Sequence, residues 1–177
     1  MLRGTTVGLR ARIETDVPIL HAELYDDVAT RVRADTRPWR PISPGSPASP
    51  AALAESDDRE ATFSVVRLRD DELAGYAVLW NIDPYNRMAH VGLSLRPSFR
   101  GQGLGLDVVR VLCRYGFAIR GLHRLQLETL VDNHAMIQTA TRAGFVPEGT
   151  LRRASWVDGE FVDEVLFGLL VEEWAGS

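Results

Sequence analysis

The segment Leu95-Arg96-Pro97-Ser98-Phe99-Arg100-Gly101-Gln102-Gly103-Leu104-Gly105 joins an apolar, strand-like run at residues 91–95 to a long helix-like run at residues 106–119. A helix that begins in this way leaves its first backbone N–H groups without intrahelical acceptors. Those donors and the positive end of the helix dipole favour phosphate oxygens. Glycine allows a ligand to approach such a backbone closely. The segment therefore predicts a phosphate-binding loop between a strand and a helix.

Two common phosphate-binding loops do not fit this segment. The dinucleotide fingerprint Gly-x-Gly-x-x-Gly lacks its third glycine, because Leu106 or Val108 stands at that position. A Walker loop requires a lysine, and all 20 basic residues of the chain are arginine. The pattern that remains is Arg-x-x-Gly-x-Gly, formed by Arg100, Gly103 and Gly105.

This pattern resembles the pyrophosphate loop of the GNAT N-acetyltransferases. A second match is formed by Asn133 and Gly144-Phe145, which have the spacing of the family's later helix. The C-terminal segment from Asp163 to Trp174 is most similar to the RimJ/RimL branch. The resemblance covers essentially the whole chain, and it implies a transfer of acetyl from acetyl-CoA to an amine acceptor.

The composition sets the limits within which a function can be sought. With 177 residues and 45% hydrophobic content, the chain is expected to form a single domain over residues 1–177. A net charge of −4 argues against nucleic-acid binding. The lone Cys113 excludes an internal disulfide and is expected to be a buried thiol. We expect no metal site and no membrane segment, and a cytoplasmic location.

Alternation and helical spacing predict the element order βααβββαβαββ. This order implies an α/β (α+β) GNAT fold, with a mixed, mostly antiparallel sheet of about seven strands flanked by helices. The proline-rich segment 37–50 is expected to be a loop. Strands are predicted at residues 6–12, 61–68, 73–82, 87–95, 123–131, 148–157 and 160–170, and helices at 15–28, 50–56, 106–119 and 133–143.

The resemblance also implies where acetyl-CoA binds. A backbone N–H of the segment Leu93 to Leu95, with Leu95 as the catalytic candidate, would stabilise the oxyanion, and this segment would pair with the pantetheine amides. Arg96 and Arg142 are expected to reach the 3′-phosphate or adenine. The cofactor-binding set is Leu93, Ser94, Leu95, Arg100, Gly101, Gln102, Gly103, Leu104, Gly105, Asn133 and Arg142.

Acetyl transfer to an amine needs a base, and two residues are candidates. His90 lies in the strand before the glycine loop, where related sequences often have glutamate, and its imidazole suits proton transfer near neutral pH. Glu128 is the alternative, near the end of the strand that faces the cofactor. The acid that many members use is absent, because Ala140 and Met136 occupy its two usual positions. Another donor (Tyr85, Thr139 or water) could replace it, or the thiolate could leave unaided.

The acceptor is expected under the first helices and the proline-rich segment. Trp39 and Tyr85 are the candidate substrate-binding residues, and a small-molecule amine is the first hypothesis. A protein N-terminus is the second hypothesis, and a CoA-binding protein without efficient catalysis is the third. A homodimer through the last strands is possible. Four acidic residues could attract a cationic amine: Glu23, Asp26, Asp27 and Asp35.

Overall fold

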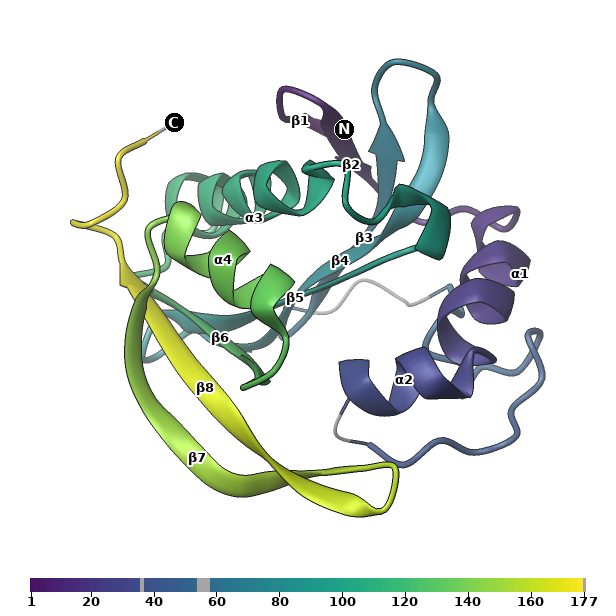
Figure 1. Ribbon diagram of the computed structural model, residues 1–177. Helices are drawn as coiled ribbons and strands as arrows, with labels where there is room; N and C mark the ends of the chain where they lie inside the picture. Colours follow the sequence, from purple (N-terminus) through teal and green to yellow (C-terminus); the bar gives the residue numbers. More distant parts are fainter. Residues whose placement is uncertain (36, 54–57, 177) are drawn as a thin grey trace.

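One mixed sheet organises the computed structural model, which describes residues 1–35, 37–53 and 58–176. Its strands lie in the order β1-β2-β3-β4-β5-β6-β8-β7 (Figure 1). Strands β5 and β6 are parallel, and the other neighbouring strands are antiparallel. The predicted fold class is confirmed, and the short β1 is an eighth strand that the alternation pattern does not predict. The strands are β1 Leu2–Arg3, β2 Val7–Arg10, β3 Ala61–Arg67, β4 Glu72–Asp83, β5 Met88–Leu95, β6 Arg124–Leu130, β7 Val146–Val157 and β8 Glu160–Leu170.

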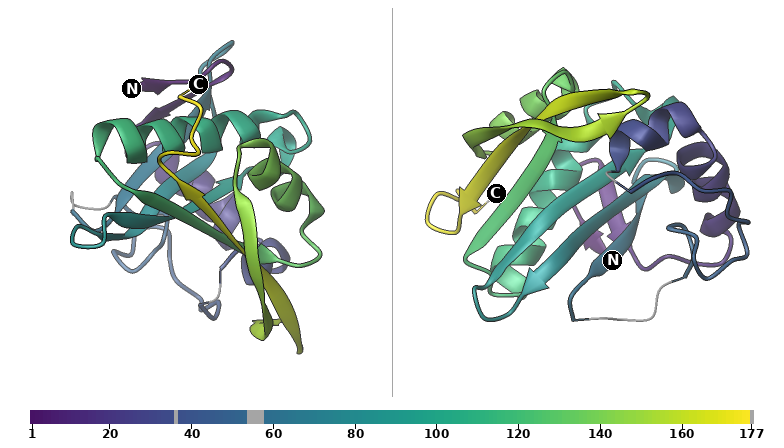
Figure 2. Two further views of the ribbon diagram at one scale, coloured as in Figure 1. Left: turned by 90° about the vertical axis from the view of Figure 1, so that its left-hand side faces the viewer. Right: turned by 90° about the horizontal axis from the view of Figure 1, so that it is seen from below.

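The helices form two groups on opposite faces of the sheet (Figures 1 and 2). On one face lie α3 (Leu104–Arg114), which continues in a π-helical turn to Ile119, and α4 (His134–Arg142). On the other lie α1 (Asp16–Leu20), a π-helical turn (His21–Tyr25) and α2 (Val28–Ala34). Among the described residues, no helix has both the length and the apolar character needed to cross a membrane.

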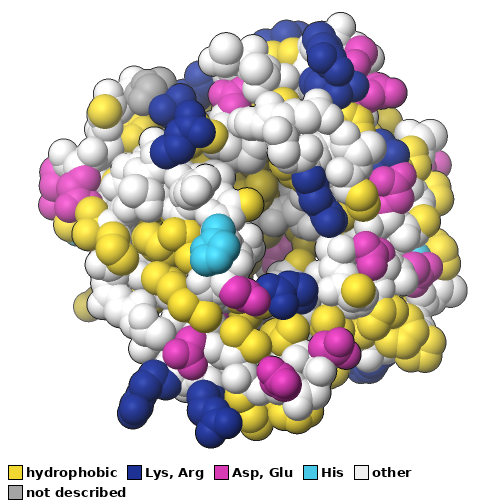
Figure 3. Space-filling model, in the orientation of Figure 1, with side chains coloured by type: hydrophobic (Ala, Val, Ile, Leu, Met, Phe, Trp, Pro, Cys, Tyr) yellow, Lys and Arg dark blue, Asp and Glu magenta, His cyan; other side chains and the backbone are white. Residues whose placement is uncertain are grey.

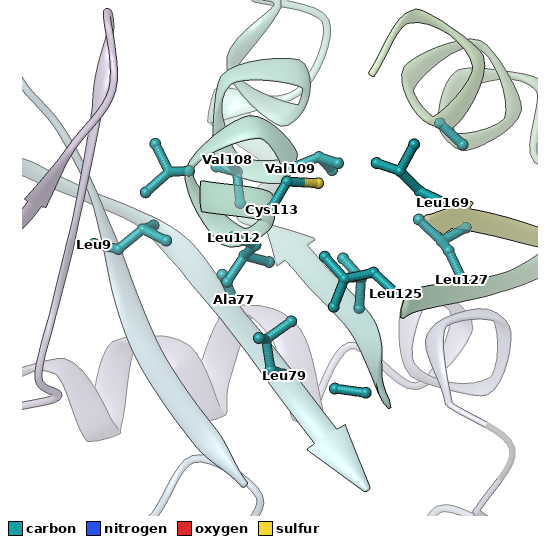
Figure 4. Packing of buried hydrophobic residues seen from close by; sticks show 14 of the residues in the cluster. Leu9, Ala77, Leu79, Val108, Val109, Leu112, Cys113, Leu125, Leu127 and Leu169 are labelled. Carbon is teal, nitrogen blue, oxygen red and sulfur yellow. The ribbon is translucent and has the colours of Figure 1, made fainter. Parts of the chain in front are cut away.

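Helix α3 supplies the centre of the main hydrophobic core (Figure 4). Its apolar residues recur three to four positions apart, so they share the side that faces the sheet. Full burial of each such side chain stabilises the fold by about 1.5–3 kcal/mol. The labelled core residues in Figure 4 are Leu9, Ala77, Leu79, Val108, Val109, Leu112, Cys113, Leu125, Leu127 and Leu169, all at most 1% exposed.

Local turn chemistry confirms several sequence predictions. Asp158 and Gly159, between β7 and β8, both have positive φ (46° and 93°), as a two-residue hairpin turn requires. Gly144 follows α4 with φ 98°, the left-handed conformation that commonly ends a helix. Cys113 is buried, and this burial raises the pKa of its thiol to about 12.

The first predicted helix is wrong in its continuity. Periodic apolar residues indicate one helix from residue 15 to 28, but the structure interrupts it at Asp26 and Asp27. The Asp27 carboxylate accepts hydrogen bonds from the Thr30 N–H (3.2 Å) and hydroxyl (2.6 Å), so it caps a new helix, α2. Val28, the last residue of the predicted helix, begins α2 instead and is 41% exposed.

The second predicted helix, at residues 50–56, is not formed in its described part. Residues 50–53 lie in turns and irregular structure, and Ser56 lies outside the described residues. Ser49 begins this turn, because its hydroxyl accepts a hydrogen bond from the Ala51 N–H (3.2 Å). Such local hydrogen bonds compete with helix formation. The described residues of the proline-rich segment form no helix or strand, as predicted.

The N-terminal strands are tied to the first turn of α3 by Asp107. Its carboxylate accepts hydrogen bonds from the N–H groups of Thr5 (3.1 Å), Thr6 (2.6 Å) and Val7 (3.0 Å). Burial of Asp107 opposes ionisation, but these hydrogen bonds outweigh it and lower the pKa of the carboxyl. An acidic residue at a helix N-terminus also complements the helix dipole. Asp107 therefore fixes β2 against the helix that follows the glycine loop.

Candidate active site

The site is built where the two central strands separate. Pairing between β5 and β6 runs from Met88↔Arg124 to His90↔Gln126 and stops there. Strand β5 continues to Leu95 along β4, while β6 continues to Leu130 along β8. The ends of β5 and β6 therefore diverge. Figure 3 shows that the face seen in Figure 1 is hollowed near its centre, with acidic and basic side chains around the hollow.

Backbone amides of β5 point into the gap between these strands. The Arg96 N–H donates to the Ala74 carbonyl (2.9 Å), so it points toward β4. Because N–H directions alternate along a strand, those of Leu93 and Leu95 point the opposite way, toward β6. No pairing of these residues with β6 occurs in the described structure. The gap thus offers donors to an extended polar ligand.

The glycine loop has the backbone shape that close phosphate contact requires. Gly101 (φ 70°) and Gly103 (φ 78°) adopt left-handed conformations, and Gly103 is the N-cap of α3. A methyl group built on either glycine would meet no described atom within 4 Å, so the space above the loop is open. At Gly105 the nearest atoms to such a methyl, on Leu93 and Thr139, are 3.9 Å away. The protein therefore leaves an open cradle around these glycines.

Side chains hold this loop in place. The Arg100 Nε donates to the Leu95 carbonyl (2.9 Å), across the base of the loop. The Gln102 amide donates to the Ser98 carbonyl (2.7 Å), and its oxygen accepts from Arg67 (3.1 Å). Gln102 and Arg100 therefore shape the loop, and its free backbone donors remain those of the first turn of α3.

His90 and Glu128, predicted as alternative bases, are brought together at the vertex of the gap. The His90 Nδ1 lies 3.0 Å from Glu128 Oε1 and 3.2 Å from Oε2. Glu128 is partly buried, which disfavours its charge, but hydrogen bonds from His90 and from Gln126 (2.6 Å) outweigh this and lower its pKa. An ionised carboxylate only accepts hydrogen bonds, so Nδ1 donates to it, and in that tautomer Nε2 is the acceptor nitrogen of the ring.

Two further residues position the imidazole, and the sequence analysis does not find them. Trp80 is the cross-strand partner of His90, with ring centroids 4.3 Å apart. The Asn81 amide nitrogen lies 3.4 Å from His90 Nε2, and Asn81 has φ 50° beside an irregularity in β4. Register between β4 and β5 would have indicated Trp80, but the irregularity that turns Asn81 has no clear sequence signal.

The family comparison agrees with this geometry. The profile of the acetyltransferase (GNAT) domain matches residues 6–146. This chain belongs to the GNAT family. Among relatives, the putative ribosomal N-acetyltransferase YdaF of Bacillus subtilis is 34% identical over 110 residues, which cover 62% of this chain and 60% of that protein. The ribosomal-protein-serine acetyltransferase of Escherichia coli is 30% identical over 104 residues, with 59% and 58% coverage. These relatives place the chain in the RimJ/RimL-like branch.

A solved GNAT structure extends the comparison over the whole fold. Spermidine N-acetyltransferase from Vibrio cholerae, in complex with CoA and spermine, has a TM-score of 0.77 with this structure at 20% sequence identity. The match covers 96% of this chain and 98% of that one. At this identity the likeness establishes the fold alone. The chain spans about three fifths of the length of the curated relatives named above.

The other predicted residues of this GNAT protein are divided between the gap and more distant positions. Asn133 caps α4: its Oδ1 accepts from the Met136 N–H (3.3 Å), and its Nδ2 donates to the Thr129 hydroxyl (3.0 Å). Arg142 lies exposed in the last turn of α4. The Arg96 guanidinium is held by Glu23 (2.5 Å), which links the end of β5 to the turn after α1.

The two candidate substrate-binding residues lie apart from the vertex. Tyr85 is 91% exposed in the turn between β4 and β5, five residues before His90. Trp39 packs near Tyr25, with ring centroids 6.4 Å apart, and is half-buried in the proline-rich segment. In this structure Trp39 therefore belongs to the packing beneath the first helices.

The two positions where GNAT proteins often carry the acid are occupied by side chains that contact the core. Ala140 is completely buried in the main core, and Met136 packs against that core. Of the alternative donors, Thr139 lies closest to the gap, because it borders the open space at Gly105 together with Leu93.

Proposed function

We propose that this protein transfers the acetyl group of acetyl-CoA to a primary amine of a small molecule, by direct attack in a ternary complex. The observation that carries the proposal is the His90–Glu128 pair at the vertex of a gap lined by unpaired β5 amides. A base within reach of a row of free amide donors is what thioester aminolysis requires. Membership of the GNAT family supports the same chemistry.

Acetyl-CoA fits the open cradle as a substrate. Its pyrophosphate would accept hydrogen bonds from the N–H groups at the start of α3, where Gly101, Gly103 and Gly105 leave space. Its pantetheine arm would run along β5 like an added strand, with the Leu93 and Leu95 amides as donors. The thioester then lies in the gap, near the vertex.

His90 is the proposed base. An alkylammonium has a pKa of about 10, so a proton must be removed before attack at neutral pH. His90 Nε2 accepts this proton, directly or through one water, while the Glu128 carboxylate orients the ring and stabilises the imidazolium. Glu128 thus acts through His90. The two residues, predicted as alternative bases, are proposed to work as a pair in which His90 is the base.

The amine nitrogen then forms a bond to the thioester carbon, and the carbonyl becomes an oxyanion. A β5 amide, that of Leu95 or Leu93, donates a hydrogen bond to this oxygen. Collapse breaks the carbon–sulfur bond and releases the CoA thiolate, and the nitrogen gives up its second proton to the thiolate or to water, which leaves the neutral amide. A thiol has an ordinary pKa of about 8.5, so the thiolate can leave with only a weak donor such as Thr139 or water beside it.

A protein N-terminus is the second candidate acceptor. The names of the relatives from Bacillus subtilis and Escherichia coli, which refer to ribosomal proteins, favour it. The hollow on the face seen in Figure 3 favours a small amine instead. An enclosed acceptor pocket excludes a folded protein chain more readily than an open groove does.

The decisive experiment measures CoA thiol release by purified protein, with acetyl-CoA and panels of amino acids, polyamines, aminoglycosides and N-terminal peptides. We expect one small-amine class to stimulate release, with formation of its N-acetyl product. Release with peptides alone would establish the second candidate. If CoA raises the melting temperature but no amine stimulates release, the protein binds CoA without efficient catalysis, and the proposal fails.

A further inference from the structure

Two of the four acidic side chains near the acceptor side are paired with arginine. Glu23 pairs with Arg96, and Asp35 is shared by Arg31 and Arg37, each at 2.7 Å. Asp27 caps α2, and Asp26 lies 3.3 Å from His21. Glu23 and Asp35 are therefore compensated by arginine, whereas among the described residues Asp27 bonds only to the neutral Thr30, and Asp26 is exposed. The expectation that the four residues draw in a cationic amine thus rests on Asp26 and Asp27.

Two arginines on the same side each have a buried N–H group without a hydrogen-bond acceptor among the described residues. Arg31 is 4% exposed, and its Nε has no hydrogen-bond partner among the described residues. The Nε of Arg12 is also buried and unpartnered within the described ranges. The guanidinium of Arg12 donates to the carbonyls of Pro50 (3.0 Å) and Ala52 (3.1 Å), which carry no full charge. A buried guanidinium N–H without an acceptor costs free energy unless a ligand or a water molecule accepts its hydrogen bond.

Arg31 faces a small cavity between the first helices and the sheet. Leu20, Leu24, Tyr25, Ala51 and Tyr76 line it together with Arg31. Its volume of about 10 Å³ has room for a single oxygen-sized group. Burial raises the pKa of the Tyr76 hydroxyl, so this group stays protonated and can donate a hydrogen bond. The cavity thus combines a guanidinium N–H that has no acceptor among the described residues, on an arginine whose terminal nitrogen pairs with Asp35, with a neutral donor.

The cavity lies one strand away from the acetyl-transfer gap. Ala77 and Leu79 face α3, so Tyr76 and Trp80 point to the opposite face of β4. Tyr76 is the cross-strand partner of Ser94, and Trp80 that of His90. Strand β5 lies about 5 Å from β4 and forms one side of the gap, so the cavity beside Tyr76 and the gap at Ser94 flank the same stretch of β5.

We propose that the acceptor is a small amine that carries a carboxylate, and that Arg31 and Tyr76 recognise this carboxylate. The inference rests on the proposed function, because it names the acceptor class of the same site. One carboxylate oxygen occupies the cavity and accepts from Arg31 Nε and from the Tyr76 hydroxyl, while the amine extends over Ser94 into the gap. A polyamine would instead bring a second cation toward Arg12, Arg31 and Arg37, and Arg31 and Arg37 share a single carboxylate, that of Asp35.

Matched amines test this directly. Thiol release is measured with 4-aminobutanoate, butylamine and 1,4-diaminobutane, which share a four-carbon chain, and with 3-aminopropyl phosphate. We expect kcat/KM for 4-aminobutanoate to exceed that for butylamine about 10- to 100-fold. One or two hydrogen bonds to a charged group produce a difference of this size. Equal use of butylamine, or preference for 1,4-diaminobutane, overturns the inference while acetyl transfer itself stands. Preference for the phosphate overturns the carboxylate assignment.

Variants separate recognition from folding. Arg31→Gln should remove the preference for 4-aminobutanoate over butylamine, and Tyr76→Phe, which deletes only a hydroxyl, should reduce it about tenfold or less. The matched control is Arg33→Gln, on the same helix, where Arg33 is exposed and pairs with Asp132 at 2.6 Å. An unchanged preference in a folded Arg31→Gln, or in Tyr76→Phe if Arg31→Gln does not fold, contradicts the proposal.

Binding provides a readout that does not depend on turnover. Calorimetry measures 4-aminobutanoate binding to CoA-loaded protein, in the parent and in Tyr76→Phe. If binding is seen and weakened in Tyr76→Phe, but no amine is acetylated, the carboxylate site stands and the proposed function fails. If 4-aminobutanoate does not bind, the cavity holds water only, and the inference is overturned.

Discussion

The glycine loop and the cavity under the first helices are the two proposed ligand sites, and they are made of different atoms. The loop presents backbone N–H groups, and its shape depends on a few adjacent residues with positive φ, such as Gly101 and Gly103. The cavity presents side chains from α1, α2, the proline-rich segment and β4, which are far apart in the sequence. A backbone site can therefore be recognised from a short motif, whereas a side-chain site depends on tertiary packing.

The largest effect is expected at the vertex between these two regions. His90→Ala should lower kcat about 10²- to 10⁴-fold, since it removes the general base, while CoA affinity stays unchanged. Steady-state thiol release and calorimetric CoA binding measure the two quantities. His123→Ala, at an exposed histidine, is the control. A parallel loss of CoA affinity in His90→Ala would show that the vertex belongs to the cofactor region.

Gly105→Ala isolates the backbone site. The new methyl group would meet no described atom closer than 3.9 Å, and alanine favours helix over glycine, so the melting temperature should stay equal or rise. CoA affinity should fall about 10- to 100-fold, because the methyl displaces phosphate from one or two charge-assisted hydrogen bonds. Gly149→Ala, which also adds a methyl in open space, should leave both unchanged. Unaltered CoA binding in Gly105→Ala would place the phosphates elsewhere.

Asp107→Asn tests a residue that supports the glycine loop through its contacts with Thr5, Thr6 and Val7 and is not proposed to contact a ligand. Asparagine keeps one acceptor oxygen but loses the charge, so unfolding free energy at pH 7 should fall by about 1–2 kcal/mol. Because the folded pKa of Asp107 lies below its unfolded value, the stabilisation is complete above the unfolded pKa of about 3.9 and disappears as pH falls through the folded pKa. Denaturant unfolding of both proteins at pH 7 and pH 3 measures this. A difference that grows at low pH would contradict it.

The smallest effect concerns the ion pair that joins the two regions. Glu23 on the acceptor side and Arg96 at the end of β5 are partly exposed, so solvent screens their attraction. A double-mutant cycle with Glu23→Gln and Arg96→Gln should give a coupling of about 0.2–1 kcal/mol in unfolding free energy. The Michaelis constants for acetyl-CoA and for the amine should change little. A change in both would mean that the regions are coupled through this pair.

The same contrast explains what could be predicted from the sequence. The loop, the strand before it and the helix after it follow from glycine spacing and apolar periodicity. His90 and Glu128 were each proposed as a base, but their contact depends on where β5 and β6 stop pairing, which periodicity does not encode. Arg31 and Tyr76 gave no signal, because an arginine on a short helix and a tyrosine in a strand are ordinary until packing buries them.

Cys113 is the one thiol of the chain, and its burial in the core has a practical result. Disulfide reagents react with thiolates, and a thiol with a pKa of about 12 is almost entirely protonated at neutral pH. Colour developed by such a reagent during turnover therefore reports released CoA, with no background from the folded protein. The rate at which Cys113 is labelled under the same conditions would report the rate at which the core opens. One reagent can therefore follow both catalysis and unfolding.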